Sequence, residues 1–161
     1  TAEYFKNKFS LEDSIEEIMN DWNTMAYNYY TNDIKLKPGA LQYLLKLKEL
    51  GIKIGLATSN SMHLLTTTLK SNNAFELFDA ITVTDEVEKS KSNPDIYLLA
   101  AKKLGVNPSE CMVFEDIIAA VYGAKLAGMK VTGVYDKHSE HQIDILKKEC
   151  DNYIYNYEDL I

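Results

Sequence analysis

The segment IKIGLATSNS, residues 52–61, passes from apolar side chains to hydroxyl and amide side chains within one short stretch. Residues 52–57 have the composition of a buried strand, and a helical pattern extends from about Ser61 to Leu69. The segment therefore predicts a strand, a polar loop and a helix in direct succession. At the carboxyl end of a parallel strand, such a loop lies where open α/β sheets bind their ligands.

The same alternation continues towards the C-terminus. Asn93 and Pro94 suit the cap and the first residue of a helix, and Ser139 and Gln142 have capping-box spacing in another. Strands alternating with helices in this way predict an α/β fold, a Rossmann-like parallel sheet with helices on both faces. The further strands are expected at residues 81–83, 112–114, 131–134 and 152–155, and the helices at 93–105, 118–127 and 139–148.

The first thirty-odd residues carry only helical patterns. Apolar side chains recur at helical spacing over residues 11–30, with Ser10 as the expected N-cap. A polar break follows, and Pro38 is expected at the first position of the next helix. We therefore expect residues 1–35 to form a partial helical cap and residues 36–161 to form the α/β core.

Charge and composition exclude several classes of function. The net charge is −7, and all 17 basic residues are lysine. This balance argues against nucleic acid and membrane surfaces as partners, because both require a basic face. Without arginine, a phosphate must be held by lysine, hydroxyl groups, backbone amides or a metal ion. Cys111 and Cys150 lack metal-binding or redox spacing, which favours reduced thiols and a cytoplasmic location.

Three groups of polar residues fall at or near predicted strand ends. Thr58, Ser59 and Asn60 precede a helix, where hydroxyl groups and free amides can bind an anion or can simply cap the helix. Glu115 and Asp116 follow a strand, where paired carboxylates can hold Mg²⁺ or can simply favour the helix dipole.

Lys91 lies between these two groups in the sequence. It precedes a capped helix and can reach the same crevice as a point charge, although a loop lysine is most often only solvated. Each of these signals has an ordinary structural explanation when it is taken alone.

Taken in order, the three groups resemble the conserved motifs of the haloacid dehalogenase (HAD) hydrolases. Residues 37–60 resemble the second motif with its preceding helix, and Lys91 with Pro94 and Asp95 resembles the third. Residues 111–116, followed by 124–129, resemble the fourth. The similarity is greatest to the β-phosphoglucomutase-like branch, whose helical cap is inserted after the first strand.

This resemblance implies a Mg²⁺-dependent phosphohydrolase that acts on small phosphorylated metabolites through an aspartyl-phosphate. Thr58 would bind the transferring phosphoryl group with help from Ser59 and Asn60, and Lys91 would neutralise developing charge. Glu115 and Asp116 would hold Mg²⁺. A sugar-phosphate mutase of the β-phosphoglucomutase kind is the alternative that the resemblance leaves open.

One motif of the family is absent. The first strand of these enzymes ends in an Asp-x-Asp pair that supplies the nucleophile and the general acid, and the 161 residues contain no Asp-x-Asp. That strand is central in the family's sheet, so we expect an upstream segment or self-association to complete it. We also expect this segment alone to be inactive.

Smaller departures leave a different class of function open. Ser92, Ile117 and Ala120 replace a proline, a serine and a glycine that are usual in the third and fourth motifs. With the absent nucleophile, they allow a non-catalytic HAD-like binding module. The order of the segments and the Lys91 motif disfavour a flavodoxin-like or receiver-type fold.

Overall fold

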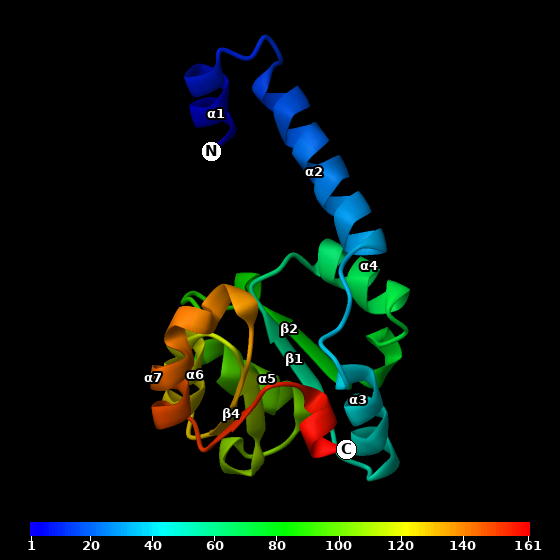
Figure 1. The fold of residues 1–161 in the computed structure, drawn as a ribbon, viewed down its shortest axis with the longest axis vertical. Helices are drawn as coiled ribbons and strands as arrows, with labels where there is room; N and C mark the ends of the chain where they lie inside the picture. The colour runs from blue at the N-terminus through cyan, green and yellow to red at the C-terminus, as the bar shows by residue number, and fades with distance from the viewer.

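The computed structural model describes residues 1–161, and its five short strands form two separate parallel groups (Figure 1). In the first, Thr58 of β1 is in register with Val83 of β2; in the second, Glu115 of β3 is in register with Gly133 of β4. Each of β1 and β3 has a strand on one side only, so the parallel α/β fold is present but its sheet is divided. The groups are β1 (Gly55–Thr58) with β2 (Ala80–Val83), and β3 (Met112–Glu115), β4 (Lys130–Val134) and β5 (Asn152–Ile154) in that order.

Helices hold the two groups of strands together. The helix α5 packs against β1 and β2, α6 packs against β3 and β4, and α5 and α6 also contact each other. The largest buried cluster lies along this contact and includes Ile96, Tyr97, Val121, Val131 and Leu146. Full burial of such a side chain contributes roughly 1.5–3 kcal/mol, so this cluster stabilises the contact between the two groups of strands. The core helices are α3 (Ala40–Glu49), α4 (Met62–Ser71), α5 (Asp95–Leu104), α6 (Ile118–Leu126) and α7 (Ile143–Glu149).

An arm of two helices, α1 (Ala2–Phe9) and α2 (Ile15–Asn32), projects from the core (Figure 1). Its base is fixed to α4, because the Thr68 hydroxyl donates a hydrogen bond to the Tyr30 carbonyl oxygen at 3.1 Å. Large apolar side chains along it are exposed, including Met19 and Met25. The assignment of residues 1–35 to a partial cap stays a prediction. Even α2, at 18 residues the longest helix, lacks the apolar length that crossing a membrane requires.

The helix expected over residues 11–30 begins later than predicted. Ser10 is not its N-cap but ends α1 in the left-handed conformation, with φ of 50°. Ser14 caps α2 instead, in a capping box whose two hydrogen bonds with Glu17 measure 2.8 and 3.2 Å. The Ser-x-x-Glu spacing satisfies two amide groups at once, so it outcompetes Ser10 as the start of the helix.

Three other predicted boundaries are also displaced. Pro38 precedes α3 rather than opening it, because Gly39 is the N-cap with φ of 74°. An added Cβ at Gly39 would lie 2.5 Å from the backbone nitrogen of Glu158, which leaves no room for a side chain. The strand expected from residue 52 is confined to β1, and the helix expected to open at Pro94 begins at Asp95.

The capping box predicted for Ser139 and Gln142 does not form. Ser139 is buried within a 3-10 segment, η4 (Lys137–Gln142), and α7 begins only at Ile143. The Gln142 side chain bonds to a different helix, accepting a hydrogen bond from the amide of Ile118 at 2.9 Å. This partner is distant in the sequence, so local spacing could not indicate it.

Candidate functional site

The polar loop after β1 is ordered by its own side chains. The Thr58 hydroxyl oxygen accepts a hydrogen bond from the Asn60 amide at 3.0 Å, and the Asn60 carbonyl oxygen Oδ1 accepts one from the Ser61 amide at 2.9 Å. Ser61 then caps α4 by accepting from the Leu64 amide at 3.4 Å. Because Ser61 performs the capping, the Thr58 hydroxyl proton and the Asn60 amino group stay available to a ligand. Ser59 is exposed beside them.

Lys91 and Glu115, predicted separately, form an ion pair in the structure. The Glu115 side chain is only 9% exposed and that of Lys91 21%, so water screens their attraction weakly. The Tyr97 hydroxyl donates to the same carboxylate oxygen at 2.9 Å, and Lys91 Nζ lies 5.8 Å from the centre of the Tyr97 ring. Burial, together with the charge of Glu115, raises the pKa of Tyr97, so the hydroxyl keeps the proton that it donates.

Close packing of α6 fixes the backbone of Lys91. A Cβ added at Gly123 would lie 2.0 Å from the Lys91 carbonyl oxygen and 2.8 Å from that of Asn93. Glycine at this position therefore lets the loop lie directly on the helix, which holds Lys91 towards Glu115.

We expect Gly123→Ala to destabilise the fold by about 1–3 kcal/mol, because the new methyl group forces this loop away from α6. Helix propensity alone predicts the opposite sign, a gain of up to about 1 kcal/mol. The free energy of unfolding in urea distinguishes the two effects. A stabilised variant would show that the loop moves aside without cost and that the packing does not fix Lys91.

Asp116 differs from Glu115 in having no partner. It is half-buried at the end of β3, and its carboxylate makes no hydrogen bond or ion pair in the structure. Burial, followed by the negative charges of Asp116 and Glu115, raises the pKa of Tyr157 to about 12. The negative charges of the carboxylate pair thus act on the half-buried Tyr157.

The donor groups at the end of β3 fit part of a magnesium site. Mg²⁺ is commonly held by one or two carboxylates, with water and substrate oxygens completing its coordination. Asp116 and the second oxygen of Glu115 are free to serve in this way. No group of three or more histidine, cysteine or acidic side chains gathers at any point of the structure. Water and substrate oxygens would complete the coordination of an ion held by these two carboxylates.

A cavity of about 970 Å³ separates the two groups of strands. Apolar side chains of β1, β3, α3 and α5 line most of it, and Asn60 and Glu115 face it from the ends of the strands. On one side the rings of Tyr43, Phe114 and Tyr157 pack together with centroids 5.5–5.8 Å apart. The cavity thus lies between β1 and β3, and two of the predicted site residues, Asn60 and Glu115, line it.

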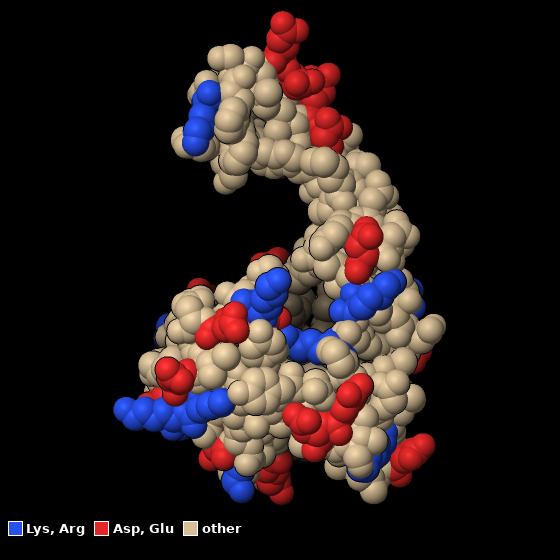
Figure 2. Space-filling model, viewed as in Figure 1, with Lys and Arg blue, Asp and Glu red and all other residues tan.

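The structure joins some of the predicted site residues through side-chain bonds and not others. Lys91 forms an ion pair with Glu115, and Thr58 accepts a hydrogen bond from the Asn60 amide, whereas the side chains of Ser59 and Asp116 bond to no other predicted site residue. Figure 2 shows lysine side chains on the part of the core that faces the hollow below the arm, with acidic side chains beside them. These cations favour an anionic ligand even though the whole chain is acidic.

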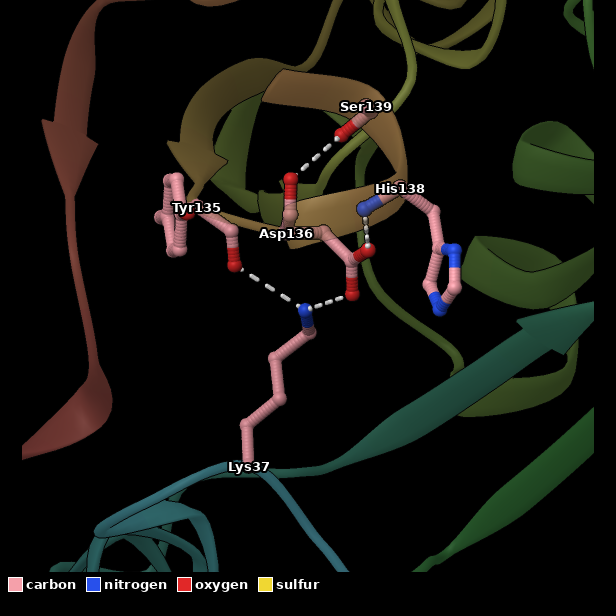
Figure 3. Close-up of polar contacts among 5 residues, drawn as sticks. All are labelled: Lys37, Tyr135, Asp136, His138 and Ser139. Atoms are coloured by element: carbon pink, nitrogen blue, oxygen red, sulfur yellow. Dashed lines mark hydrogen bonds and ion pairs between the residues drawn. The ribbon is translucent and has the colours of Figure 1, made fainter.

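Lys37 and Asp136 were not predicted as part of the site. Lys37 Nζ lies 2.5 Å from Asp136 Oδ2 and donates to the Tyr135 carbonyl oxygen at 3.0 Å (Figure 3). The hydrogen bond from Lys37 holds the pKa of the Asp136 carboxyl below its ordinary value. Asp136 lies two residues after the end of β4, so the rule that singled out the ends of the other strands could have indicated it. Tyr97, inside a helix, carried no such signal.

Comparison with known proteins gives the family. The haloacid dehalogenase-like hydrolase family matches residues 2–128. The chain is 47% identical over 103 residues to "Putative phosphatase YhcW" of Bacillus subtilis, covering 64% of this chain and 47% of that protein. It is 34% identical over 95 residues to hexitol phosphatase B of Escherichia coli, covering 59% and 43%. The chain thus spans less than half the length of either relative.

A solved structure agrees with the sequence relatives. The "putative beta-phosphoglucomutase" of Thermotoga maritima superposes with a TM-score of 0.82 at 27% identity, covering 96% of this chain and 72% of that one. The likeness extends over the arm and both groups of strands, since nearly the whole chain is covered. With the match over residues 2–128, it follows that the chain belongs to the haloacid dehalogenase-like hydrolases.

Proposed function

We propose that this chain supplies most of the active site of a Mg²⁺-dependent phosphatase that acts on small phosphorylated metabolites. The ion pair of Lys91 with the buried Glu115 is the observation that carries the proposal, because it lies beside the unpartnered Asp116 and because Glu115 lines the same cavity as Asn60. The family and the phosphatases among its relatives support it.

The resemblance to the family implies a role for each residue, and the chemistry of each side chain is consistent with that role. The Thr58 hydroxyl, with the amide groups of Ser59 and Asn60, would donate hydrogen bonds to the phosphoryl oxygens. The Lys91 ammonium would stabilise the negative charge that develops during transfer. Asp116 and Glu115 would hold Mg²⁺, which when bound neutralises phosphate charge and aligns the phosphoryl group for attack.

We further propose that an additional strand fills the cavity between β1 and β3 and carries the nucleophile. Both strands have an unpaired edge, and the walls between them are apolar, which suits a parallel strand. An Asp-x-Asp at its carboxyl end would lie beside Lys91 and Asp116. The first aspartate would attack phosphorus while the second protonates the leaving oxygen, and water would then hydrolyse the aspartyl-phosphate. Without this strand the chain would be inactive.

A mutase of the β-phosphoglucomutase kind is the second candidate. The structural likeness to a protein of that name favours it. The two reactions share the same first step and differ in whether water or a sugar hydroxyl accepts the phosphoryl group. A complete arm that excludes water would favour the mutase, whereas hydrolysis of simple aryl phosphates favours the phosphatase.

The proposed strand can be tested by adding it to the chain. Lys46 Nζ donates to the carbonyl oxygens of Leu160 and Ile161 at 3.3 and 3.1 Å, which places the C-terminus beside the end of α3, near the start of β1. A strand such as Val-Ile-Ile-Phe-Asp-Leu-Asp-Gly, joined after Ile161 by a glycine-serine linker, can therefore enter the cavity parallel to β1. A matched fusion with Asn-Leu-Asn is the control.

In both fusions we expect the backbone amides of β1 and β3 that face the cavity to exchange more slowly with deuterium than in the parent. Unchanged exchange in both would show that the cavity does not accept a strand. The function itself is tested in the same fusions by hydrolysis of p-nitrophenyl phosphate, with and without Mg²⁺. Activity in the aspartate fusion alone would support the proposed mechanism.

A further inference from the structure

A chain of polar contacts joins the base of the arm to the loop that carries Asp116. It begins at Lys37, which lies in the linker between α2 and α3. The Lys37 ammonium crosses to the end of β4, where it contacts the Asp136 carboxylate and the Tyr135 carbonyl oxygen (Figure 3). The Asp136 side chain is 25% exposed, so this pair is partly shielded from water.

Asp136 in turn fixes the start of η4. Its second carboxylate oxygen accepts a hydrogen bond from the His138 amide at 2.8 Å, and its carbonyl oxygen accepts one from the Ser139 hydroxyl at 3.4 Å. Ser139 is only 5% exposed, which anchors the turn in the protein (Figure 3). The position of η4 therefore depends on the carboxylate that Lys37 holds.

The other end of η4 reaches the acidic loop. Gln142, its last residue, accepts a hydrogen bond from the Ile118 amide at 2.9 Å. Ile118 opens α6 two residues after Asp116, and the N-cap residue Ile117 has no side-chain acceptor for the amides of the first turn. Gln142 thus supplies, from a distant segment, an acceptor for the first amide of α6.

We propose that Gln142 is a positioning residue for Asp116, and that the Lys37–Asp136 pair sets where Gln142 stands. The arm linker and the carboxylate proposed to hold the metal ion are thereby connected through η4. This inference rests on the proposed function, because it assumes that Asp116 holds a divalent ion. It assigns to Lys37, Asp136 and Gln142 a role that acts through other residues rather than on the substrate.

The test measures metal binding and amide exchange in the 161-residue chain, so it requires no turnover. Mn²⁺ prefers the same oxygen ligands as Mg²⁺, and its affinity can be followed by paramagnetic broadening of amide signals. In Gln142→Leu we expect exchange of the Ile118 amide to rise about tenfold, since one hydrogen bond is lost. We expect Mn²⁺ affinity to fall by about fivefold or more.

Matched variants separate this role from simple helix capping. Gln142→Glu keeps an acceptor and should restore slow exchange at Ile118. Lys37→Met should speed exchange at both His138 and Ile118, and Lys37→Arg should restore it. Faster exchange in Gln142→Leu with unchanged Mn²⁺ affinity would overturn the inference, because Gln142 would then only cap α6.

Asp116→Asn separates this inference from the function on which it rests. If Asp116→Asn weakens Mn²⁺ binding and Gln142→Leu does not, the positioning role is wrong and the proposed function stands. If Asp116→Asn leaves Mn²⁺ affinity unchanged, both are overturned.

Discussion

Lys91→Ala, introduced into the fusion that carries the Asp-Leu-Asp strand, is expected to lower kcat for aryl phosphate hydrolysis by about a thousandfold. Lys91 is the cation paired with the buried Glu115, so its removal takes away the positive charge and leaves a carboxylate held only by Tyr97. The measurement compares kcat and KM of Lys91→Ala with those of the parent fusion at saturating Mg²⁺. A change confined to KM would mean that Lys91 binds the substrate without stabilising the transition state.

The exposed Lys89 provides a matched control two residues away. Lys89→Ala should leave kcat within about twofold of the parent fusion, because a solvated charge contributes little. Urea unfolding of Lys91→Ala shows whether the loss of activity reflects unfolding. If a folded Lys91→Ala protein keeps more than a third of the parent's kcat, the role proposed for Lys91 is wrong.

Asp116→Asn has the second largest expected effect, a loss of about a thousandfold in Mg²⁺-dependent hydrolysis. The substitution keeps the size of the side chain and removes the charge that attracts the metal ion. Because Asp116 has no hydrogen bond or ion pair in the structure, its replacement should change the free energy of unfolding by no more than about 0.5 kcal/mol. Lost activity with unchanged stability is the signature of a functional carboxylate.

Asp144→Asn is the control for that substitution, since Asp144 is exposed in the first turn of α7. It removes the same charge from the protein without touching the cavity. Mg²⁺ titrations of the two variants should therefore differ. Equal Mg²⁺ dependence in Asp116→Asn and Asp144→Asn would remove Asp116 from the proposed site.

Much of the site follows from the sequence because its residues stand at strand ends. Thr58 and Glu115 close β1 and β3, and a short apolar run followed by polar residues marks such a position without knowledge of the tertiary structure. The position of strand ends does not predict the contact between Lys91 and Glu115, because this contact depends on how α6 packs against the loop at Gly123. Packing of this kind has no local sequence signal.

The divided sheet could be anticipated only in part. The missing Asp-x-Asp predicted that one strand was absent, but strand patterns alone do not state which edges stay unpaired. Gln142 illustrates a different limit, because its partner Ile118 lies 24 residues earlier in the sequence. Local spacing predicted a capping box between Ser139 and Gln142, but the Gln142 side chain bonds to the Ile118 amide instead.

Hydrolysis of p-nitrophenyl phosphate by the Asp-Leu-Asp fusion, compared with the Asn-Leu-Asn fusion at the same Mg²⁺ concentration, tests the central claim most directly. The claim is that the strand ends of this chain form a phosphoryl-transfer site that one inserted strand completes. It predicts Mg²⁺-dependent turnover in the aspartate fusion and none above background in the asparagine fusion. Equal, background rates in both fusions, with deuterium exchange showing the strand in place between β1 and β3, would contradict it.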